Sequence, residues 1–473
     1  MKRKPGGYNS FIFFIILSIA FLALSCNSDD TSNSGGSNGG GNEVTPGVDE
    51  IGIISVDDDG NEGDDDSQNP SISSNGKIVA FESFATNLVQ DNVNVFSDIY
   101  VHDINTGLTE RITDGFDGPS DGDSKAPSMS SGGRFVAFES TATNLVLTVT
   151  DDNGVISDIF LHDQAGAGLT TIISLDRDGE GANGDSESPS INSDGTFIAF
   201  QSRATDLVSI ISDGNGSTPD IFLYNVINDA TTIISLDTSS RGANGASTSP
   251  SVDRDGDMIA FESTATDIDP LTSGDNGSIP DIFIHDRSGP GDPTNTIISI
   301  DTNGEGADGA SANPSISADG RFVAFQSVAT DLVADVPFEN GGISDIFVHD
   351  LLTGITEIIT LDTNGEGTNN NSTDPSISSD GRFVAYRSFA SDLVANDTND
   401  QADIFVHDRQ ENATVRINVN RSGNQASGGT SDSPTISING GFVAFDSLAV
   451  NLISIIDTNG SFDVFVTPNS LIQ

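Results

Sequence analysis

The chain repeats one pattern seven times, and this repetition restricts the possible folds more than any other feature of the sequence. Each copy has a Pro-Ser or Pro-Thr step, a Gly turn, an apolar run, an Asp/Asn-rich loop, a second apolar run and an alternating segment. The copies follow at intervals of 57 to 64 residues. Such a period is typical of repeat folds, in which length does not indicate domain number. The steps begin at Pro70, Pro127, Pro189, Pro250, Pro314, Pro375 and Pro434.

Each copy is predicted to form four strands. In the fifth copy, Gly turns at residues 318–320 and 352–354 are hairpin signals. Residues 322–325 and 346–348 are apolar at successive positions, so neighbouring sheets must cover both faces of these strands. The segment 356–361 alternates, as expected for an outer edge. Radial stacking of such sheets predicts an all-β fold, a seven-bladed β-propeller of four-stranded blades.

The copies supply seven first strands but only six fourth strands, because the chain reaches Pro468 soon after the last third strand. The missing fourth strand is found at the other end. Residues 53–57 repeat the fourth-strand pattern of residues 172–176. We therefore predict that residues 51–56 pair beside residues 462–466, so that the N-terminal strand closes the ring in the last blade.

The repeat units read PSISxDGRFVAFxSxATDLV and DIFVHDxxTG, and they resemble the WD-like β-propeller repeats of TolB-type proteins. The resemblance covers residues 51–467. TolB-type proteins combine a six-bladed propeller with a preceding α/β domain, and no such domain is expected before this ring. The resemblance therefore implies the propeller fold and leaves the TolB function aside.

The charge of the chain limits its partners. It contains 71 Asp and Glu against 18 Lys and Arg, a net charge of -53. A surface this anionic repels phosphate backbones, which excludes nucleic acid, and it attracts divalent cations. Hydrophobic residues still make up 35% of the chain and fall in regular short runs. That distribution favours a packed core over an acidic disordered chain.

The N-terminus has the pattern of a secretory signal. A basic start precedes an apolar run over residues 11–24 and then Cys26, the only cysteine. The run is too short to span a bilayer comfortably. Residues 22–26 resemble the bacterial lipobox, although Ala23 stands where Leu is usual. The alternative is an ordinary signal peptide with Cys26 buried or discarded.

Resemblance to bacterial lipoproteins implies several acyl chains on Cys26, which is what stable anchoring requires. We expect three regions: a lipoprotein-type signal peptide over residues 1–25, a flexible Gly/Ser/Asn-rich tether over 26–50, and the propeller over 51–473.

Two patterns that could suggest catalysis are better explained by structure. Residues 118–122 fit the Gly-x-Ser-x-Gly nucleophile pattern, but no helix is expected to follow. All the histidines occupy one repeat position, on five different blades, which favours packing over metal binding. They are His102, His162, His285, His349 and His407.

An Asp begins every third strand. A catalytic residue is needed once, so seven copies favour a hydrogen bond that caps local backbone amides. The seven are Asp98, Asp158, Asp220, Asp281, Asp345, Asp403 and Asp463.

Acidic loops gather on one face, because the chain reverses at every hairpin and brings the second-to-third and fourth-to-first connections together. Alternating oxygens with a Gly turn suit calcium, which takes six to eight oxygens, but they are also ordinary turn chemistry. Both interpretations stay open. The candidate ligands are Asp397, Asn399, Asp403, Asp457, Asn459 and Asp463, and similar spacing recurs at Asp176, Asp178 and Glu180 and at Asp301, Asn303 and Glu305.

These features predict a monomeric, non-enzymatic lipoprotein of the bacterial cell envelope, facing the periplasm or the exterior, that binds a protein or glycan partner. The alternative is a propeller lyase or glycosidase that uses acidic residues near the central channel. The chain has no Trp, so it lacks the usual sugar-stacking platform and the Trp that an Asp-box sialidase repeat requires.

Overall fold

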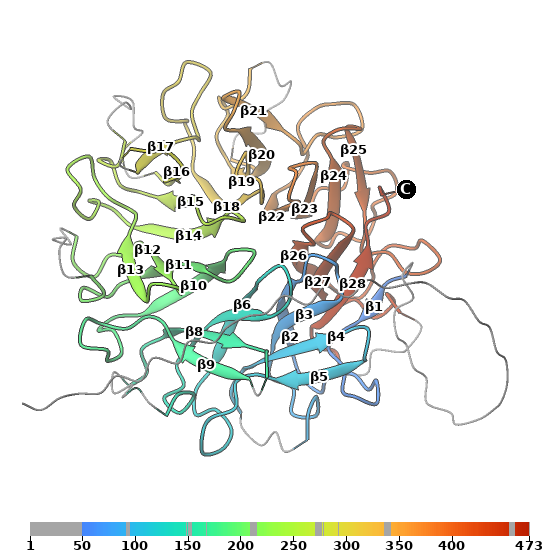
Figure 1. The fold of residues 1–473 in the computed structure, drawn as a ribbon. Helices are drawn as coiled ribbons and strands as arrows, with labels where there is room; N and C mark the ends of the chain where they lie inside the picture. Colours follow the sequence, from blue (N-terminus) through green and yellow to red (C-terminus); the bar gives the residue numbers. More distant parts are fainter. Residues whose placement is uncertain are drawn as a thin grey trace, which may run out of the picture. The chain divides into compact units, whose positions relative to one another are not determined.

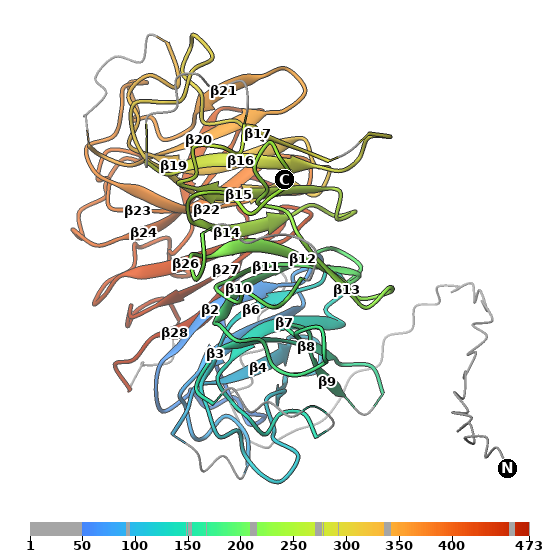
Figure 2. The ribbon, with the colours of Figure 1, turned by 90° about the vertical axis from the view of Figure 1, so that its left-hand side faces the viewer.

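The computed structural model confirms the all-β, seven-bladed propeller, and its described residues form strands and turns without a helix. Figure 1 shows the blades arranged around an axis, and Figure 2 views the ring from the side, with strands running between its two faces. The structure describes residues 50–90, 95–147, 149, 154–166, 168–208, 215–269, 277, 279–291, 293–334, 342–453 and 459–472.

The first strand of each blade lies nearest the axis and the second strand beside it (Figure 1). The first strands are β2 Ser67–Ile72, β6 Ser124–Met129, β10 Ser186–Ile191, β14 Ser247–Val252, β18 Ser311–Ile316, β22 Ser372–Ile377 and β26 Ser431–Ile436. The second strands are β3 Ile78–Ser83, β7 Phe135–Ser140, β11 Phe197–Ser202, β15 Met258–Ser263, β19 Phe322–Ser327, β23 Phe383–Ser388 and β27 Phe442–Ser447.

The third and fourth strands follow outwards, all antiparallel to their neighbours. The third strands are β4 Asp98–Asp103, β8 Asp158–Asp163, β12 Asp220–Asn225, β16 Asp281–Asp286, β20 Asp345–Asp350, β24 Asp403–Asp408 and β28 Asp463–Pro468. The fourth strands are β5 Leu108–Arg111, β9 Leu169–Ile172, β13 Ala230–Ile233, β17 Thr294–Ile297, β21 Ile355–Ile358, β25 Ala413–Arg416 and, in the last blade, β1 Gly52–Ile53.

Neighbouring blades cover both faces of each central strand, as the apolar runs predict. On β19, Val323 and Phe325 pack with residues of the preceding blade, while Ala324 packs with the following one. Within each blade, a second-strand aromatic stacks on its third-strand partner, as Phe325 does on Phe347 with ring centroids 5.9 Å apart. The core is therefore a series of seven apolar layers between adjacent blades.

The Pro-Ser steps lie in the first strands, where a bulge shifts the register in every blade. Pro70 costs no ladder bond there, because this strand is the inner edge of its sheet. The residue before it, Asn69, has a φ of 50°, and the six equivalent residues also have positive φ. The serine after the proline joins two blades, since the backbone N–H of Met129 donates to Ser71 Oγ at 2.9 Å.

Turn glycines are required where blades approach closely. Gly381, in the turn between β22 and β23, has a φ of 69°, and a Cβ there would overlap the Phe322 ring of the preceding blade. The hairpin glycine is therefore needed for both its dihedral angle and its packing.

The N-terminal strand closes the ring, as the sequence predicts. Gly52 pairs with Val466 and Ile53 with Phe465, and the N–H of Ile54 donates to the carbonyl of Val464 at 2.7 Å. The Ser55 hydroxyl donates to Asp463 at 2.8 Å. In the other blades, the side chain two positions after the fourth strand makes the same bond to the first residue of the third strand.

Deleting residues 51–57 removes these backbone pairs and leaves β28 as an exposed edge. We expect the free energy of unfolding to fall by about 3 kcal/mol or more, since each lost bond contributes about 0.5–1.5 kcal/mol. Urea denaturation measures the change. A matched deletion of seven residues, 35–41, in the Gly/Ser-rich stretch is the control, and equal effects of the two deletions would contradict the closure.

Candidate functional site

Channel-side polar residues form the most regular polar feature near the axis. The fifth residue of each second strand is polar and follows four apolar or aromatic residues, and it faces the first strand of the next blade. Five of them accept a hydrogen bond from the positive-φ residue there, at 2.8 to 3.2 Å, and Glu262 accepts one from Asn313. The seven residues are Glu82, Glu139, Gln201, Glu262, Gln326, Arg387 and Asp446.

The charges of these seven channel-side residues are unevenly compensated. Burial raises the pKa of Glu82, Glu139 and Glu262. Burial also raises the pKa of Asp446 to about 7, with Asp432 and Glu82 adding repulsion. Asp432 lies directly opposite Asp446 in the β26–β27 pair and forms an ion pair with Arg387. One polar residue after four apolar ones in each second strand is the sequence signal for these channel-side residues, and they were not among the predicted site residues.

The axis also holds a small hollow at the end where the first and second strands turn. It has a volume of about 160 Å³ and is lined by residues from all seven blades, among them Met129, Ile191 and Ile316. Its wall is mostly Ile, Val and Ser, and its charged residues are Asp253 and Arg254. Burial raises the pKa of Asp253, whose carboxyl accepts the N–H groups of Asp257 and Met258 in its own turn.

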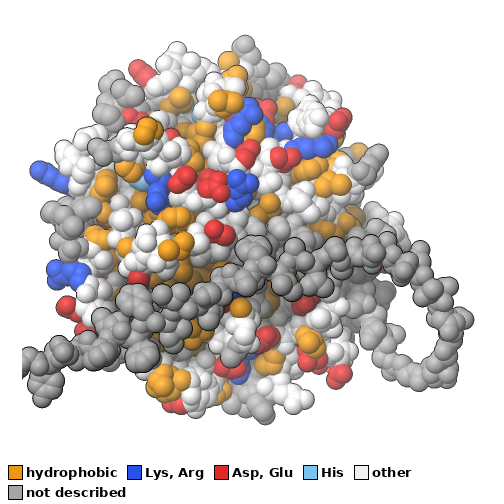
Figure 3. All heavy atoms as spheres, viewed as in Figure 1, with side chains coloured by type: hydrophobic (Ala, Val, Ile, Leu, Met, Phe, Trp, Pro, Cys, Tyr) orange, Lys and Arg blue, Asp and Glu red, His pale blue; other side chains and the backbone are white. Residues whose placement is uncertain are grey.

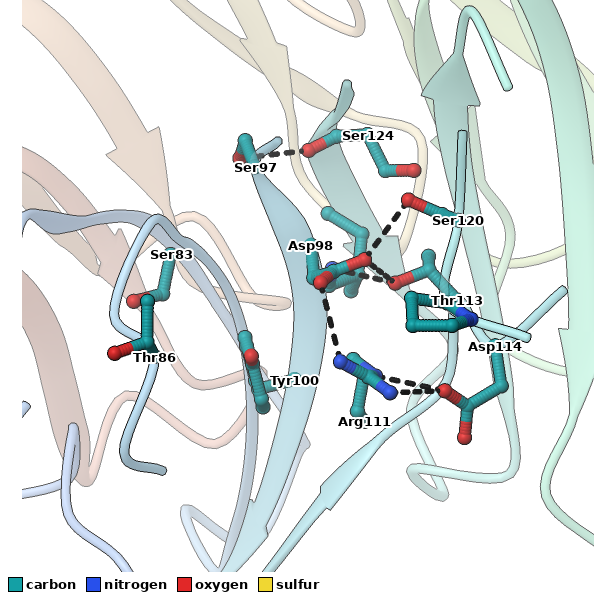
Figure 4. A network of polar contacts seen from close by, with 12 residues as sticks. Ser83, Thr86, Ser97, Asp98, Tyr100, Arg111, Thr113, Asp114, Ser120 and Ser124 are labelled. Carbon is teal, nitrogen blue, oxygen red and sulfur yellow. Dashed lines mark hydrogen bonds and ion pairs between the residues drawn. The ribbon is translucent and has the colours of Figure 1, made fainter. Parts of the chain in front are cut away.

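The Asp that begins each third strand is buried in every blade. Its carboxylate accepts a hydrogen bond from a side chain that follows the fourth strand, at 2.6 to 2.8 Å. Figure 4 shows Asp98 receiving bonds from Thr113 and Ser120. These bonds support the structural role of the Asp. The donors are side chains that follow the fourth strand, and not the local backbone amides that the sequence led us to expect.

Two blades place an arginine beside this buried Asp. In blade one, Arg111 lies 3.5 Å from Asp98 and donates to Asp114 (Figure 4). In blade six, Nη1 of Arg416 lies 3.1 Å from Asp397 and 3.2 Å from Asp403. The other fourth strands end in Ile, so the sequence signalled these arginines as departures from the repeat.

The structure places the candidate calcium ligands in protein contacts. Asn399 donates to Asp403 at 3.1 Å and to the carbonyl of Ala426 at 3.2 Å. Asn459 donates to the carbonyl of Gly63 at 2.7 Å, and Asp463 accepts from Ser55. Asp457 lies outside the described residues, as does Cys26.

The turns at the similar spacings are capped by their own first residue. Asp176 accepts the N–H groups of Asp178 and Glu180, and Asp301 accepts those of Asn303 and Glu305. These bonds hold the pKa of Asp176 and of Asp301 below the ordinary value. Among the described residues, no group of three or more His, Cys, Asp or Glu side chains is arranged to hold a metal ion. Calcium binding stays a prediction.

The histidines and the serine motif are structural. Each of the five histidines is buried on its third strand, and its Nδ1 is hydrogen-bonded to a fourth-strand side chain at 2.8 to 2.9 Å. Burial lowers the pKa of each of them. Ser120 is buried and donates to Asp98 and to the carbonyl of Gly122. It therefore lacks the exposure of a nucleophile.

Comparison with known proteins supports the fold alone. No known family and no curated protein matches the sequence. An oligogalacturonate lyase in complex with manganese is 11% identical, with a TM-score of 0.50 over 86% of this chain and 92% of its own. The oligogalacturonate lyase of Vibrio parahaemolyticus is 12% identical, with a TM-score of 0.51 over 90% and 98%. TolB from Acinetobacter baumannii is 16% identical, with a TM-score of 0.37 over 79% and 76%.

Asp446→Asn tests the charge of the channel-side ring. The folded state binds a proton at Asp446 up to pH of about 7, whereas the unfolded state does so only near 3.8. The wild type therefore gains stability as pH falls from about 7 to 4. The variant removes the contribution of Asp446 and leaves that of other buried carboxyls such as Asp345, whose pKa burial raises to about 6. It should be about 1–3 kcal/mol more stable than the wild type at pH 8. Denaturation at pH 5 and pH 8 measures both effects.

Asp59→Asn is the control for that measurement, because Asp59 is an exposed turn residue. It should leave the pH dependence unchanged. An unaltered pH profile for the Asp446 variant would show that this carboxyl is not the titrating group.

Arg416→Ile replaces the internal cation of blade six with the residue that most blades have. We expect the free energy of unfolding to fall by about 3 kcal/mol, because buried Asp403 then lacks its counter-charge. Arg421→Ile, which removes an exposed pair with Glu50, is the control and should lower it by less than about 1 kcal/mol.

Melting of the Arg416 variant in chelator, in calcium and in sodium chloride of matched ionic strength shows whether calcium substitutes for the guanidinium. Equal melting curves in calcium and in matched salt would mean that these loops are turns without a calcium site.

Proposed function

We propose that this chain is a lipid-anchored propeller scaffold of the bacterial cell envelope that binds a protein or glycan partner without catalysing a reaction. The observation that supports the proposal most is the use of the axial carboxyl groups. Glu82, Glu139, Glu262 and Asp446 each accept a backbone N–H from the next blade. A general acid or base needs a carboxyl that reaches substrate, whereas these four link blades.

A further observation agrees with a binding role. Every histidine and the Asp at each third strand are engaged in contacts within their own blade.

The described residues contain no helical stretch with the length and hydropathy needed to cross a bilayer. The membrane association in this proposal rests on Cys26 and the signal pattern before it.

The alternative is a lyase or glycosidase, and Asp446 is the residue that favours it. A carboxyl whose pKa is raised to about 7 suits proton transfer at neutral pH, and Glu82 lies close enough to affect it. Asp446→Asn would then abolish release of unsaturated products from oligogalacturonate, the substrate named for the similar lyases. No product from the wild type would exclude this lyase reaction.

The binding role is tested with the acylated full chain. Cross-linking in envelope fractions identifies candidate partners, and purified candidates and a glycan array are then titrated against the chain. Saturable binding of one ligand supports the scaffold. Absence of saturable binding to every candidate protein and glycan would count against it.

Anchoring is predicted to depend on a single atom, the sulfur of Cys26. Cys26→Ser should move the protein from the membrane fraction to the soluble fraction, because Cys26 is the only thiol in the chain and the proposed lipid modification requires it. Metabolic labelling with a fatty acid measures acylation directly. A wild type that carries no label would remove the anchor from the proposal.

A further inference from the structure

One connection around the ring departs from the repeat. The six other fourth-to-first connections each contain a bridge between an apolar residue and a position six further on: Val56–Glu62, Leu175–Gly181, Leu236–Gly242, Ile300–Gly306, Leu361–Gly367 and Val419–Gln425. In the connection from β5 to β6, the bridge joins Gly115 and Gly118. This connection, residues 112–123, is one residue shorter than residues 173–185 between β9 and β10.

The regular connections cover the outer strands of the next blade. The hydroxyl of Thr109 on β5 bonds to the carbonyl of Val56, and its N–H donates to Asp58 at 3.0 Å. Asn295 on β17 likewise donates to the carbonyl of Leu236 at 3.2 Å. In the shortened connection Asp114 stands where the apolar residue would be, with 62% of its side chain exposed. The shorter loop thus presents less apolar cover to β9.

A groove lies at this position, and it is lined by residues of the first three blades, which are neighbours in the ring (Figure 1). The lining comes from β5 and the connection after it, from β9 and the loop between β7 and β8, and from the β12–β13 hairpin. Its volume is about 810 Å³, within the range of ligand pockets. Apolar side chains form much of its wall. Among them are Phe116, Leu145, Leu147, Leu169, Ile172 and Val226.

Large apolar side chains are exposed around this groove. Leu108, Phe116, Leu147, Leu169 and Ile227 are each more than half exposed. Three of them, Phe116, Leu147 and Leu169, line the groove itself, and exposed apolar surface gathered in a groove is typical of a binding site. Figure 3 shows one face of the ring, on which acidic and basic side chains are scattered among hydrophobic and uncharged ones.

The groove runs beside an open sheet edge. β9 is the outermost strand of its blade and pairs only with β8. An outer strand presents backbone N–H and C=O groups to its open side, and another extended chain can pair with them. An apolar groove beside such an edge fits alternate side chains of an added strand.

The charges of the groove favour a basic ligand. Glu110, Asp114 and Asp229 line it. Its arginine, Arg111, pairs with Asp114 and with buried Asp98. Glu110 and Asp229 therefore supply the negative charge that a cationic ligand would meet. The net charge of -53 adds attraction for a cationic segment.

We propose that this groove binds an extended peptide segment of a partner protein, which adds as a strand to β9. Its apolar side chains enter the groove and its Lys or Arg side chains face Glu110 and Asp229. The proposal rests on the proposed scaffold function and names its partner class and its site.

The test uses the full chain and a synthetic ten-residue peptide of alternating Val and Lys with a fluorescent label. Leu147→Asp with Leu169→Asp should weaken binding at least tenfold, because both substitutions place a charge in the apolar wall. Leu352→Asp with Ile355→Asp is the matched control, since Ile355 begins β21 as Leu169 begins β9. The control should bind as the wild type does, and circular dichroism checks the fold of both.

A second variant tests the charge. Glu110→Lys should weaken binding of the Val/Lys peptide and strengthen binding of a Val/Glu peptide of equal length. Equal affinity in the groove variant and its matched control would overturn the proposal, as would a wild type that binds neither peptide. If an identified partner binds the groove variant as tightly as the wild type, the groove proposal fails while the scaffold function stands.

Discussion

Every blade is apolar on both of its faces, and the rest of the structure follows from the need to cover them. On β19, Val323 and Phe325 lie on one face of the sheet and Ala324 lies on the other. A four-stranded sheet standing alone would expose both of these apolar faces to water. Because each sheet has two apolar faces, each needs two neighbours, and only a closed ring gives every sheet both. The aromatic stacks, the serine links and the glycine turns all serve this contact between blades. The last blade obtains its fourth strand from the other end of the chain for the same reason.

The contacts near the axis show how this constraint affects function. Carboxyl groups such as Glu82 lie on the second strands, close to the innermost strands, and they accept backbone N–H bonds across the blade interface. The bulge residue that donates each bond has a positive φ, and the strain is the same in seven blades. Strained residues at active sites usually differ from their surroundings. Here the strain repeats with the blades, so it belongs to the ring and marks no single site.

The sequence predicted the fold well because its signals repeat. Seven copies of one hairpin pattern determined the blade number, and the pattern of residues 53–57 identified the closing strand. Single departures were harder to interpret. Arg416 stands where most blades have Ile, and its effect on Asp397 and Asp403 depends on how two loops fold together. The same is true of Asp446, because burial by the next blade raises its pKa, and no local pattern shows that burial. The bonds of Asp176 to its own turn are local, so the sequence could indicate them. It could not distinguish such a turn from a calcium loop, because both use the same spacing of oxygen-bearing side chains.

Ring closure also sets an order for folding. Six blades are made of strands that are near neighbours in the chain, so each can form as soon as its own copy is present. The seventh needs Ser55 to find Asp463 across 408 positions. The free-energy cost of closing a loop rises slowly, by about 0.6 kcal/mol for each doubling of the loop length. The long separation in sequence therefore weakens this contact little. It delays the contact, because Asp463 is made long after Ser55. The first strand to be made is the last to be paired, and until the final third strand exists the chain has an unpaired strand at its beginning. The last blade has its four strands only when both ends of the ring have been made.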